Sequence, residues 1–403
     1  MKPPIDIQQL TSAFDSLAAW CSARGYAGHD PFDGLNSRLF QATPLLGRSR
    51  GARLVWTQAF KRSPVNLRAA ARVPAGKNAK GTALFALAWL ARWRTTQAGE
   101  AEAEARRLLE DLLNARIEGA GGATTAWGYN FDWQGRAFYA PRGTPTVVPT
   151  AFAARALVEA AQAFGDEPYL AAARGACEFI LRDLNRSDES ADEVCFSYSP
   201  LDRTRVFNAS LLAAETLAAV WSLTGEDELK HEALRAARYV VRRQRVDGSW
   251  TYGADNYQSW ADNFHTAFVL TSLARLVAAG VDESGELSKA LRRGDAFWRE
   301  NFFLADGWPK YYHDRQYPAD AHAAAAAIVC LAELSELSDA DDGARLLAQR
   351  IARWSLRHLH DRRGFFYYQR RRFHTVRTPY MRWTQAWMLY ALGRLLEGMR
   401  GEG

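Results

Sequence analysis

Cysteine is scarce and scattered in this chain of 403 residues. The four cysteines (Cys21, Cys177, Cys195 and Cys330) form no CxxC pair, and the HExxH spacing is absent. The sequence therefore predicts no zinc or other metal site and no cofactor. We expect the cysteines to be buried free thiols in a reducing cytoplasm.

Long apolar runs are also missing. Arg or Glu interrupts the longest apolar stretches within about a dozen residues, which is too short for a helix that spans a bilayer. The N-terminal segment MKPPIDIQQLTSAFDSL lacks the apolar core of a secretion signal. We therefore expect a cytoplasmic protein without a transmembrane segment.

Lysine is rare, although the net charge is +6. Almost all of the basic charge is arginine, which makes forked contacts with carboxylates and phosphates, so an anionic partner is one interpretation. Solvated helix faces are the simpler one. We find no basic helix, and the longest basic run is Arg370 to Arg372. Nucleic acid is therefore not an expected partner.

Alternating patterns typical of strands are rare, whereas helical periodicity dominates the chain. Apolar residues recur at spacings of three and four in twelve runs: 6–24, 80–97, 101–117, 147–164, 167–184, 207–224, 227–244, 262–279, 284–300, 319–336, 341–358 and 380–398. From the run at 80–97 onward, Ala- and Leu-rich runs alternate with runs that carry Arg and Glu along one face. The first kind predicts helices surrounded by protein, and the second predicts helices with a solvated side.

The paired runs repeat along the chain. The apolar member of each pair starts near 80, 147, 207, 262, 319 and 380, a period of roughly 55–67 residues. Five amphipathic runs follow the first five apolar runs, and the run at 6–24 supplies a sixth. The sequence predicts an all-α (α/α)6 toroid that forms one domain over residues 1–403. An open α-solenoid is the alternative.

Aromatic segments precede the apolar runs. WGYNFDW begins at Trp127, CFSYSP at Cys195, GSWTYG at Gly248, GWPKYY at Gly307 and GFFYYQ at Gly364. In a toroid these loops gather at one end, at the N-termini of the inner helices, where unpaired N–H groups favour anions. Their rings either pack the helix ends or line a cleft that stacks on sugar faces or an isoprenoid. We expect about half of them to serve packing.

Several motifs taken together resemble a bacterial family of polysaccharide-biosynthesis proteins, encoded among genes for surface or exopolysaccharide production. They are DPFDGLNS from Asp30, RSPVNLR from Arg62, WGYNFDWQ from Trp127, GTPTVVPTAF from Gly143, SWADNFHTAF from Ser259 and PYMRWTQAWMLYAL from Pro379. The likeness covers nearly the whole chain. The paired helices also resemble the α/α toroids of six-hairpin glycosidases, prenyltransferases and terpene cyclases. The resemblance implies a context in polysaccharide biosynthesis and assigns no catalytic residue.

Polar residues in the aromatic loops and at the starts of the apolar helices are the candidates for chemistry. The candidate catalytic residues are Asp132, Asp255, Asp262, His265, Tyr312 and His313. The candidate substrate-binding residues are Trp127, Tyr129, Trp133, Arg136, Trp250, Tyr252, Trp260, Trp308, Asp320, His322, Arg382 and Trp383. His265 follows Asp262 by three residues, so both face the same side of a helix. An N-cap role for Asp262, with His265 paired to it, is the structural alternative. Arg382 starts an apolar helix, and a buried guanidinium needs an anion.

Two chemistries suit these residues. Two carboxylates from Asp132, Asp255, Asp262 and Asp320 would serve glycoside hydrolysis. Alternatively, His265, Tyr312, His313 and Arg382 would serve a lyase or epimerase acting on a uronic acid, with Arg382 neutralising the substrate carboxylate. We expect an enzyme that cleaves or modifies a bacterial polysaccharide or oligosaccharide. A non-catalytic glycan-binding protein and an isoprenoid-binding enzyme are the alternatives, and the oligomeric state is left open.

Overall fold

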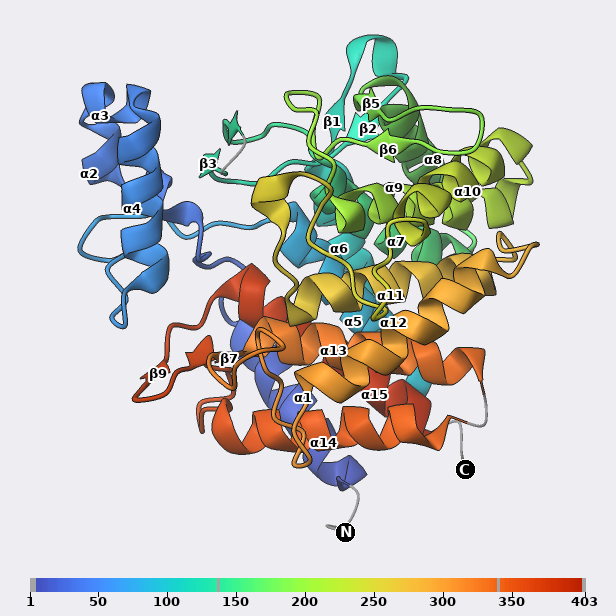
Figure 1. Cartoon of the computed structure of the whole chain (residues 1–403). Coiled ribbons are helices and arrows are strands. Elements are labelled where there is room, and N and C mark those ends of the chain that lie inside the picture. The colour runs from blue at the N-terminus through green and yellow to red at the C-terminus, as the bar shows by residue number, and fades with distance from the viewer. Residues whose placement is uncertain (1–4, 136–137, 339–340, 401–403) are drawn as a thin grey trace.

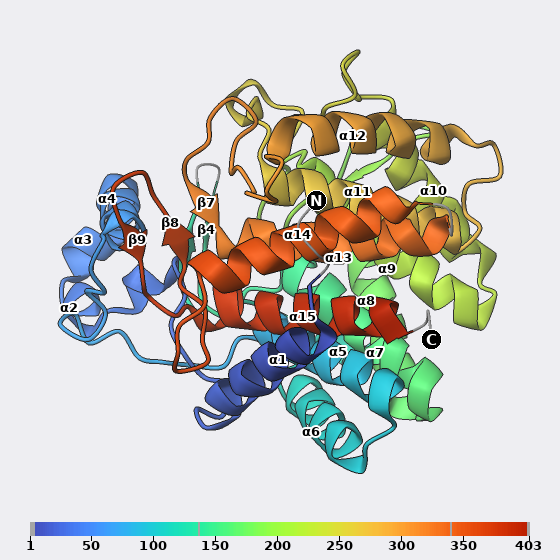
Figure 2. The same ribbon diagram turned by 90° about the horizontal axis from the view of Figure 1, so that it is seen from below.

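The computed structural model describes residues 5–135, 138–338 and 341–400 and shows a closed ring of helical hairpins (Figures 1 and 2). The inner helices are α5 (Ala79–Thr96), α7 (Val147–Phe164), α9 (Phe207–Thr224), α11 (Asn263–Ala278), α13 (Ala321–Leu337) and α15 (Trp387–Arg400), which is preceded by the π-helix η4 (Met381–Ala386). Each packs against the next, and α15 packs against α5. The predicted (α/α)6 toroid is confirmed, and the open solenoid is wrong.

Six outer helices surround this ring. They are α1 (Ile7–Ser22), α6 (Gly99–Asn114), α8 (Glu167–Arg182), α10 (Asp227–Val241), α12 (Glu286–Phe302) and α14 (Asp342–His358). The N-terminal α1 packs against α15 and so takes the sixth outer position, as predicted. All twelve expected helices lie within three residues of their predicted ends.

The inner helices are covered on all sides, which explains their composition. In α13 every residue from Ala321 to Ala327 is buried, whereas α14 buries only one face. Small and apolar side chains let helices approach on several sides without burying polar groups. The short turns to the outer helices follow Gly165 and Gly225, whose φ angles of 73° and 71° end α7 and α9 in the left-handed conformation.

Backbone hydrogen bonds connect the aromatic loops around one end of the toroid, which we call the mouth. It comprises the N-termini of the inner helices and the loops 118–146, 183–206, 242–262, 303–320 and 359–380. The first N–H of five of the six inner helices donates to a carbonyl of a neighbouring loop: Val147 to Tyr198, Phe207 to Tyr252, Asn263 to Tyr311, Ala321 to Tyr368, and Met381 of η4 to His29, at 2.9–3.2 Å. Each loop is therefore fixed to the next hairpin along the ring.

Short antiparallel strands stiffen these loops. The pairs are β1 (Ile117–Glu118) with β2 (Thr125–Ala126), β3 (Trp133–Gln134) with β4 (Tyr139–Ala140), and β5 (Arg186–Ser187) with β6 (Cys195–Phe196). β8 (Gln369–Arg370) lies between β7 (Ala319–Asp320) and β9 (Thr375–Val376). In that sheet Asp320 lies opposite Gln369, which fixes the start of α13.

An arm of three short helices projects from the mouth side of the toroid and was not predicted. We define it as residues 38–72, with α2 (Arg38–Gln41), α3 (Pro44–Arg48) and α4 (Arg50–Arg62). It follows the 3₁₀ turn η1 (Asp33–Asn36) and stands apart from the ring in both views (Figures 1 and 2). Because α4 carries Arg50, Arg53, Lys61 and Arg62 and no acidic residue, the expectation that the chain has no basic helix is wrong.

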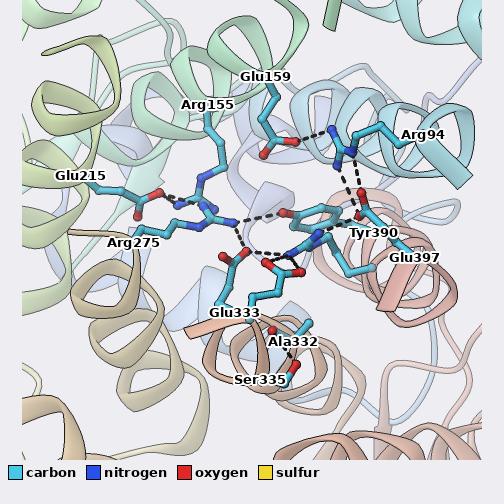
Figure 3. Close-up of polar contacts among 12 residues, drawn as sticks. Arg94, Arg155, Glu159, Glu215, Arg275, Ala332, Glu333, Ser335, Tyr390 and Glu397 are labelled. Carbon is cyan, nitrogen blue, oxygen red and sulfur yellow. Dashed lines mark hydrogen bonds and ion pairs between the residues drawn. The ribbon is translucent and has the colours of Figure 1, made fainter. Parts of the chain in front are cut away.

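Charged side chains form a closed circuit at the end of the toroid opposite the mouth (Figure 3). We call it the basal ring; its members are Arg94, Arg155, Glu159, Glu215, Arg275, Glu333, Glu336, Arg394 and Glu397. All six inner helices contribute, and an ion pair joins every neighbouring pair of them. Arg94 of α5 contacts Glu159 of α7 at 3.1 Å and Glu397 of α15 at 2.5 Å, so it spans the point where the ring closes.

Ion pairs of the basal ring also join the other neighbouring inner helices. Arg155 of α7 pairs with Glu215 of α9, and Arg275 of α11 contacts Glu215 at 2.7 Å and Glu333 of α13 at 2.5 Å. Arg394 of α15 contacts Glu333 at 3.4 Å. Burial alone would raise the pKa of Glu333, but Arg275 and Arg394 lower it to about 2. Glu333 is therefore ionised at neutral pH and attracts both arginines.

Two further expectations concern membranes and thiols. Within the described ranges, no helix is both long enough and apolar enough to cross a bilayer. All four cysteines are buried and free, as predicted.

We predict that Arg394→Met destabilises the protein by about 3–5 kcal/mol, because it leaves Glu333, Glu336 and Glu397 without their shared partner at a largely buried position. The matched control is Arg174→Met, which breaks an exposed pair with Glu226 and should cost less than about 1 kcal/mol. Urea unfolding measures both. Equal small losses would show that the basal ring does not hold the toroid closed.

Candidate active site

The first turn of α11 brings together a carboxylate and a histidine at the mouth. Asp262 is the N-cap residue, and its Oδ1 accepts the backbone N–H of His265 at 3.0 Å. Its Oδ2 lies 2.7 Å from Nδ1 of the His265 ring and 3.2 Å from the indole nitrogen of Trp260. The N-cap role and the predicted pairing therefore occur together. Asp262 is buried and holds the imidazole in one orientation.

His265 is the partly exposed member of this pair. Its side chain is 22% exposed, against 2% for Asp262. When Nδ1 donates its proton to Asp262, Nε2 of the neutral ring carries the lone pair and can accept a proton. The ring of Tyr252 lies 4.5 Å from that of His265 and stacks on Trp260 at 4.7 Å. An oriented base thus lies beside a flat aromatic surface that remains partly exposed.

The next inner helix, α13, begins with a second polar pair. Asp320 is its N-cap and accepts the N–H groups of His322 at 2.8 Å and Ala323 at 3.2 Å. Burial raises the pKa of the Asp320 carboxyl to about 7, although these hydrogen bonds oppose the shift. Neither ring nitrogen of His322 has a hydrogen-bond partner among the described residues. Burial first, and then Lys80 and Arg382, hold the pKa of His322 well below its usual value.

Aromatic contacts join the two pairs. Phe264 lies between them, with its ring 3.9 Å from His265 and 4.7 Å from His322. Trp383 of η4 meets the His322 ring at 4.2 Å and Phe264 at 5.6 Å. The starts of α11, α13 and η4 therefore bring His265, His322 and Trp383 into one cluster.

Arg382 provides the fourth element of this cluster. It is 4% exposed, and both Nε and Nη2 lie 2.6 Å from Oδ2 of Asp30. The anion that a buried Arg382 was predicted to need is thus a residue of the protein itself. Its guanidinium lies 5.2 Å from the centre of the Tyr129 ring, and the Tyr129 hydroxyl is 2.8 Å from that of Tyr198.

Below the cluster, buried side chains fill the central axis of the toroid. Phe152, Phe268 and Trp387, from three alternate inner helices, contact one another at 5.2–6.0 Å. The ammonium group of Lys80 lies over all three rings, at 4.3, 5.0 and 5.2 Å. Burial, with a further contribution from Arg382, lowers the pKa of Lys80 well below its usual value. These side chains occupy the centre where an isoprenoid-binding enzyme would need a deep apolar cavity.

A second lysine reaches the mouth from the arm. Lys61 of α4 lies 4.4 Å from the centre of the Phe32 ring, which itself contacts Trp383 at 5.3 Å. Burial lowers the pKa of Lys61, and the charges of Asp320 and Asp262 oppose that shift. Lys61 thus links the arm to the cluster through Phe32 and Trp383.

The sequence reasoning missed Asp30, Lys61 and Lys80. A signal for two of them was present: the chain has few lysines, and Lys80 begins an otherwise apolar inner helix. Asp30 lies in the motif DPFDGLNS, for which the sequence alone indicates no chemical role. In the same motif Asp33 contacts Arg68 at 2.7 Å, and Arg68 donates to the Tyr380 hydroxyl at 2.9 Å, next to η4.

Three of the predicted catalytic residues, Asp132, Asp255 and His313, lie outside this cluster, whereas Tyr312 adjoins it. Asp132 accepts the backbone N–H of Arg142 at 2.7 Å and so holds a loop. Asp255 pairs with Arg205 at 2.6 Å and caps a 3₁₀ turn. Tyr312 forms a backbone bridge with Asp262. His313 is exposed and packs against Phe297 and Phe302 of the outer helix α12.

Three predicted substrate-binding tryptophans are buried and pack the loops. The indole N–H of Trp127 donates to Leu112 at the end of α6, and that of Trp250 donates to Val240 at the end of α10. Trp308 donates to the Gln316 carbonyl and contacts Trp354 of α14. Trp133 is partly exposed and lies 5.4 Å from Tyr198, whereas Arg136 lies outside the described residues.

Solved structures share this fold at low sequence identity. A cellobiose 2-epimerase from Bacillus thermoamylovorans has 13% identity and a TM-score of 0.61, covering 82% of this chain and 90% of that one. An α-mannanase of Bacteroides thetaiotaomicron has 12% identity and a TM-score of 0.60, covering 80% and 87%. An unsaturated glucuronyl hydrolase from Streptococcus agalactiae has 12% identity and a TM-score of 0.58, covering 98% and 92%.

These likenesses establish the six-hairpin glycosidase-like fold. No family model and no curated protein matches the sequence. Among the described residues, no group of three or more His, Cys, Asp or Glu side chains is placed to hold a metal ion.

We predict a specific pH dependence from Asp320. The folded state keeps the Asp320 proton up to a pH of about 7, whereas the unfolded state loses it above about 4. The free energy of unfolding of the wild type should therefore fall relative to Asp320→Asn as the pH rises from 4 to 7, by roughly 4 kcal/mol in total. Asparagine also caps a helix, and it does not titrate.

Urea unfolding of both proteins across this pH range measures the difference between their free energies of unfolding. The other titrating groups contribute equally to both proteins and cancel in this difference. A difference that stays constant with pH would show that Asp320 is ionised throughout.

Proposed function

We propose that the protein is an enzyme that modifies a sugar unit by proton transfer, as an epimerase, an isomerase or a lyase does. The proposed context is the biosynthesis of a bacterial surface polysaccharide or exopolysaccharide. The observation that carries the proposal is the Asp262–His265 pair, whose imidazole is oriented, partly exposed and surrounded by aromatic rings. General bases need this combination of a fixed orientation and access to the substrate.

The proposed reaction begins at a carbon next to a carbonyl group of the sugar. Nε2 of His265 removes the proton from that carbon, and the electron pair forms a C=C bond while the carbonyl oxygen gains negative charge. Lys61 of the arm lies over the Phe32 ring, which contacts Trp383, and is the side chain proposed to stabilise that charge. Burial raises the pKa of Asp320 to about 7, and Asp320 is the proposed acid that protonates the oxygen.

Return of a proton to the opposite face of the carbon yields an epimer. Return to the neighbouring carbon yields an isomer, and loss of a leaving group yields the unsaturated product of a lyase. The partly exposed rings of Tyr252 and Trp260 stack on each other, and they provide a face on which a sugar ring can rest.

Hydrolysis by two carboxylates receives less support. Asp132 and Asp255 are held in loops by other partners, and both oxygens of Asp262 are engaged by His265 and Trp260. One observation does favour a glycosidase as second candidate. A buried carboxyl group with a pKa of about 7, as in Asp320, suits the general acid of glycoside cleavage. The similar folds of an epimerase and two hydrolases are compatible with both candidates.

The test is incubation of the purified protein with neutral and uronic-acid sugars, read by NMR and mass spectrometry. We predict a product of unchanged mass for an epimerase or an isomerase. For a lyase we predict two fragments, one of them unsaturated, whose masses add up to that of the substrate. His265→Ala should reduce turnover by about 10²–10⁴-fold, because a general base contributes that much. The matched control is His231→Ala, an exposed position on α10, which should leave turnover unchanged.

Other outcomes would reject the proposal. Fragments whose masses add up to that of the substrate plus one water molecule would identify a hydrolase. Sugar binding without any product would identify a glycan-binding protein. Turnover that survives His265→Ala would remove this residue from the reaction.

A further inference from the structure

The arm carries positive charge only. Residues 38–72 contain seven arginines and Lys61, and no aspartate or glutamate. Arg38, Arg48, Arg62 and Arg72 are exposed. Elsewhere in the molecule acidic residues are interspersed with the arginines and pair with several of the exposed ones, for example Glu226 with Arg174. The arm is therefore a concentrated basic surface on a protein with a net charge of only +6.

The same arm exposes apolar side chains to solvent. Large apolar residues are exposed at Leu39, Leu45, Leu46, Val55, Val65 and Leu67, and Leu45 and Val55 are 80% and 71% exposed. Single exposed apolar residues are ordinary, but a group within one projecting element marks an interaction surface. The small cluster of Trp56, Phe60, Ala71 and Val73 stabilises the arm internally, so these exposed side chains are not needed for its own core.

A second segment, distant in sequence, extends this surface. The turn between β8 and β9 carries Arg370 to Arg372 and Phe373, which is 87% exposed, and residues 369–377 contain no acidic residue. Arg371 donates to the Arg62 carbonyl at the end of α4, at 3.1 Å. Both views place β9 and α4 on the same side of the molecule (Figures 1 and 2). Two separate segments thus combine basic and exposed apolar residues in one region.

We infer that the arm and the β8–β9 turn form a docking surface for an anionic lipid bilayer. Arginines near such a bilayer gain about 1 kcal/mol each from its negative surface potential. Exposed leucine, valine and phenylalanine side chains gain by insertion at the boundary between headgroups and acyl chains. The surface offers both kinds of contact together, and a bilayer satisfies both.

Other occupants satisfy only one of these features. Nucleic acids and acidic polysaccharides attract arginine but present charged and polar groups to Leu45, Val55 and Phe373. A second copy of the chain would bring two positively charged surfaces together. Docking on a bilayer would bring the mouth close to the lipid headgroups, because the arm contacts the mouth: Lys61 lies over the Phe32 ring, which contacts Trp383 of η4.

Sedimentation of the full-length protein with vesicles tests the inference. We expect binding to vesicles of phosphatidylcholine mixed with phosphatidylglycerol, little binding to phosphatidylcholine alone, and a loss of binding as the NaCl concentration rises. The double variant Arg48→Gln/Arg62→Gln should weaken binding by roughly 25-fold, since each arginine contributes about fivefold.

A matched pair of valines tests the apolar contribution. Val55→Glu should weaken vesicle binding at least about fivefold, because it places a carboxylate where an apolar side chain inserts. Val246→Glu is the control, since Val246 is 98% exposed and lies in the loop after α10, outside both the arm and the β8–β9 turn. It should bind as the wild type does. Circular dichroism confirms that each variant is folded.

Several outcomes would overturn the inference. Equal binding to neutral and anionic vesicles, or none to either, would exclude an anionic bilayer as the partner. Stronger binding to DNA or to an acidic polysaccharide that is insensitive to Val55→Glu would assign the surface to a polyanion. A dimer in solution that Val55→Glu dissociates would assign it to a second copy of the chain.

Discussion

Closure of the toroid is the constraint on which the rest of the structure depends, and interactions at both ends enforce it. At the far end, the basal ring joins every neighbouring pair of inner helices, with Arg94 bridging the first hairpin to the last (Figure 3). At the mouth, backbone hydrogen bonds fix five of the six inner helices to an adjoining loop, and the bond from Met381 to His29 connects the last inner helix to the N-terminal segment. Residues far apart in sequence therefore have fixed positions at the mouth.

The candidate site follows from this closure. The N-termini of helices need capping groups, and α11 and α13 are capped by Asp262 and Asp320. Because these N-termini lie at the mouth, both carboxylates lie there too. The differences between them arise from their surroundings. Asp262 pairs with a partly exposed histidine, whereas Asp320 is buried more completely and holds its proton to a pH of about 7. The same kind of helix cap thus holds, on adjacent inner helices, the two residues that we propose as base and acid, His265 and Asp320.

The sequence predicts the toroid well because its helices have a strong period and a regular repeat. It predicts the Asp262–His265 pair because both residues lie within one turn. It does not reveal the partner of Arg382, since Asp30 lies 352 residues away and closure alone brings them together. The arm escaped prediction because its helices are short and bury few residues, so its apolar spacing is weak. The sequence could not show that Asp132, Asp255 and His313 lie away from the cluster. The partners that hold such loop residues, for example Arg205 for Asp255, cannot be inferred from sequence spacing.

Proton transfer by His265 is measured most directly by isotope exchange. An epimer or isomer that forms in D2O should carry one deuterium on the carbon that receives the returning proton, and mass spectrometry with NMR locates it. Recovered substrate should carry deuterium on the carbon next to its carbonyl group; for a lyase, whose product receives no proton on carbon, recovered substrate alone carries it. Wild-type protein should show this exchange, whereas His265→Ala should not. An epimer or isomer without deuterium in a carbon–hydrogen bond, or equal exchange in wild type and His265→Ala, would contradict a role of His265 as the base.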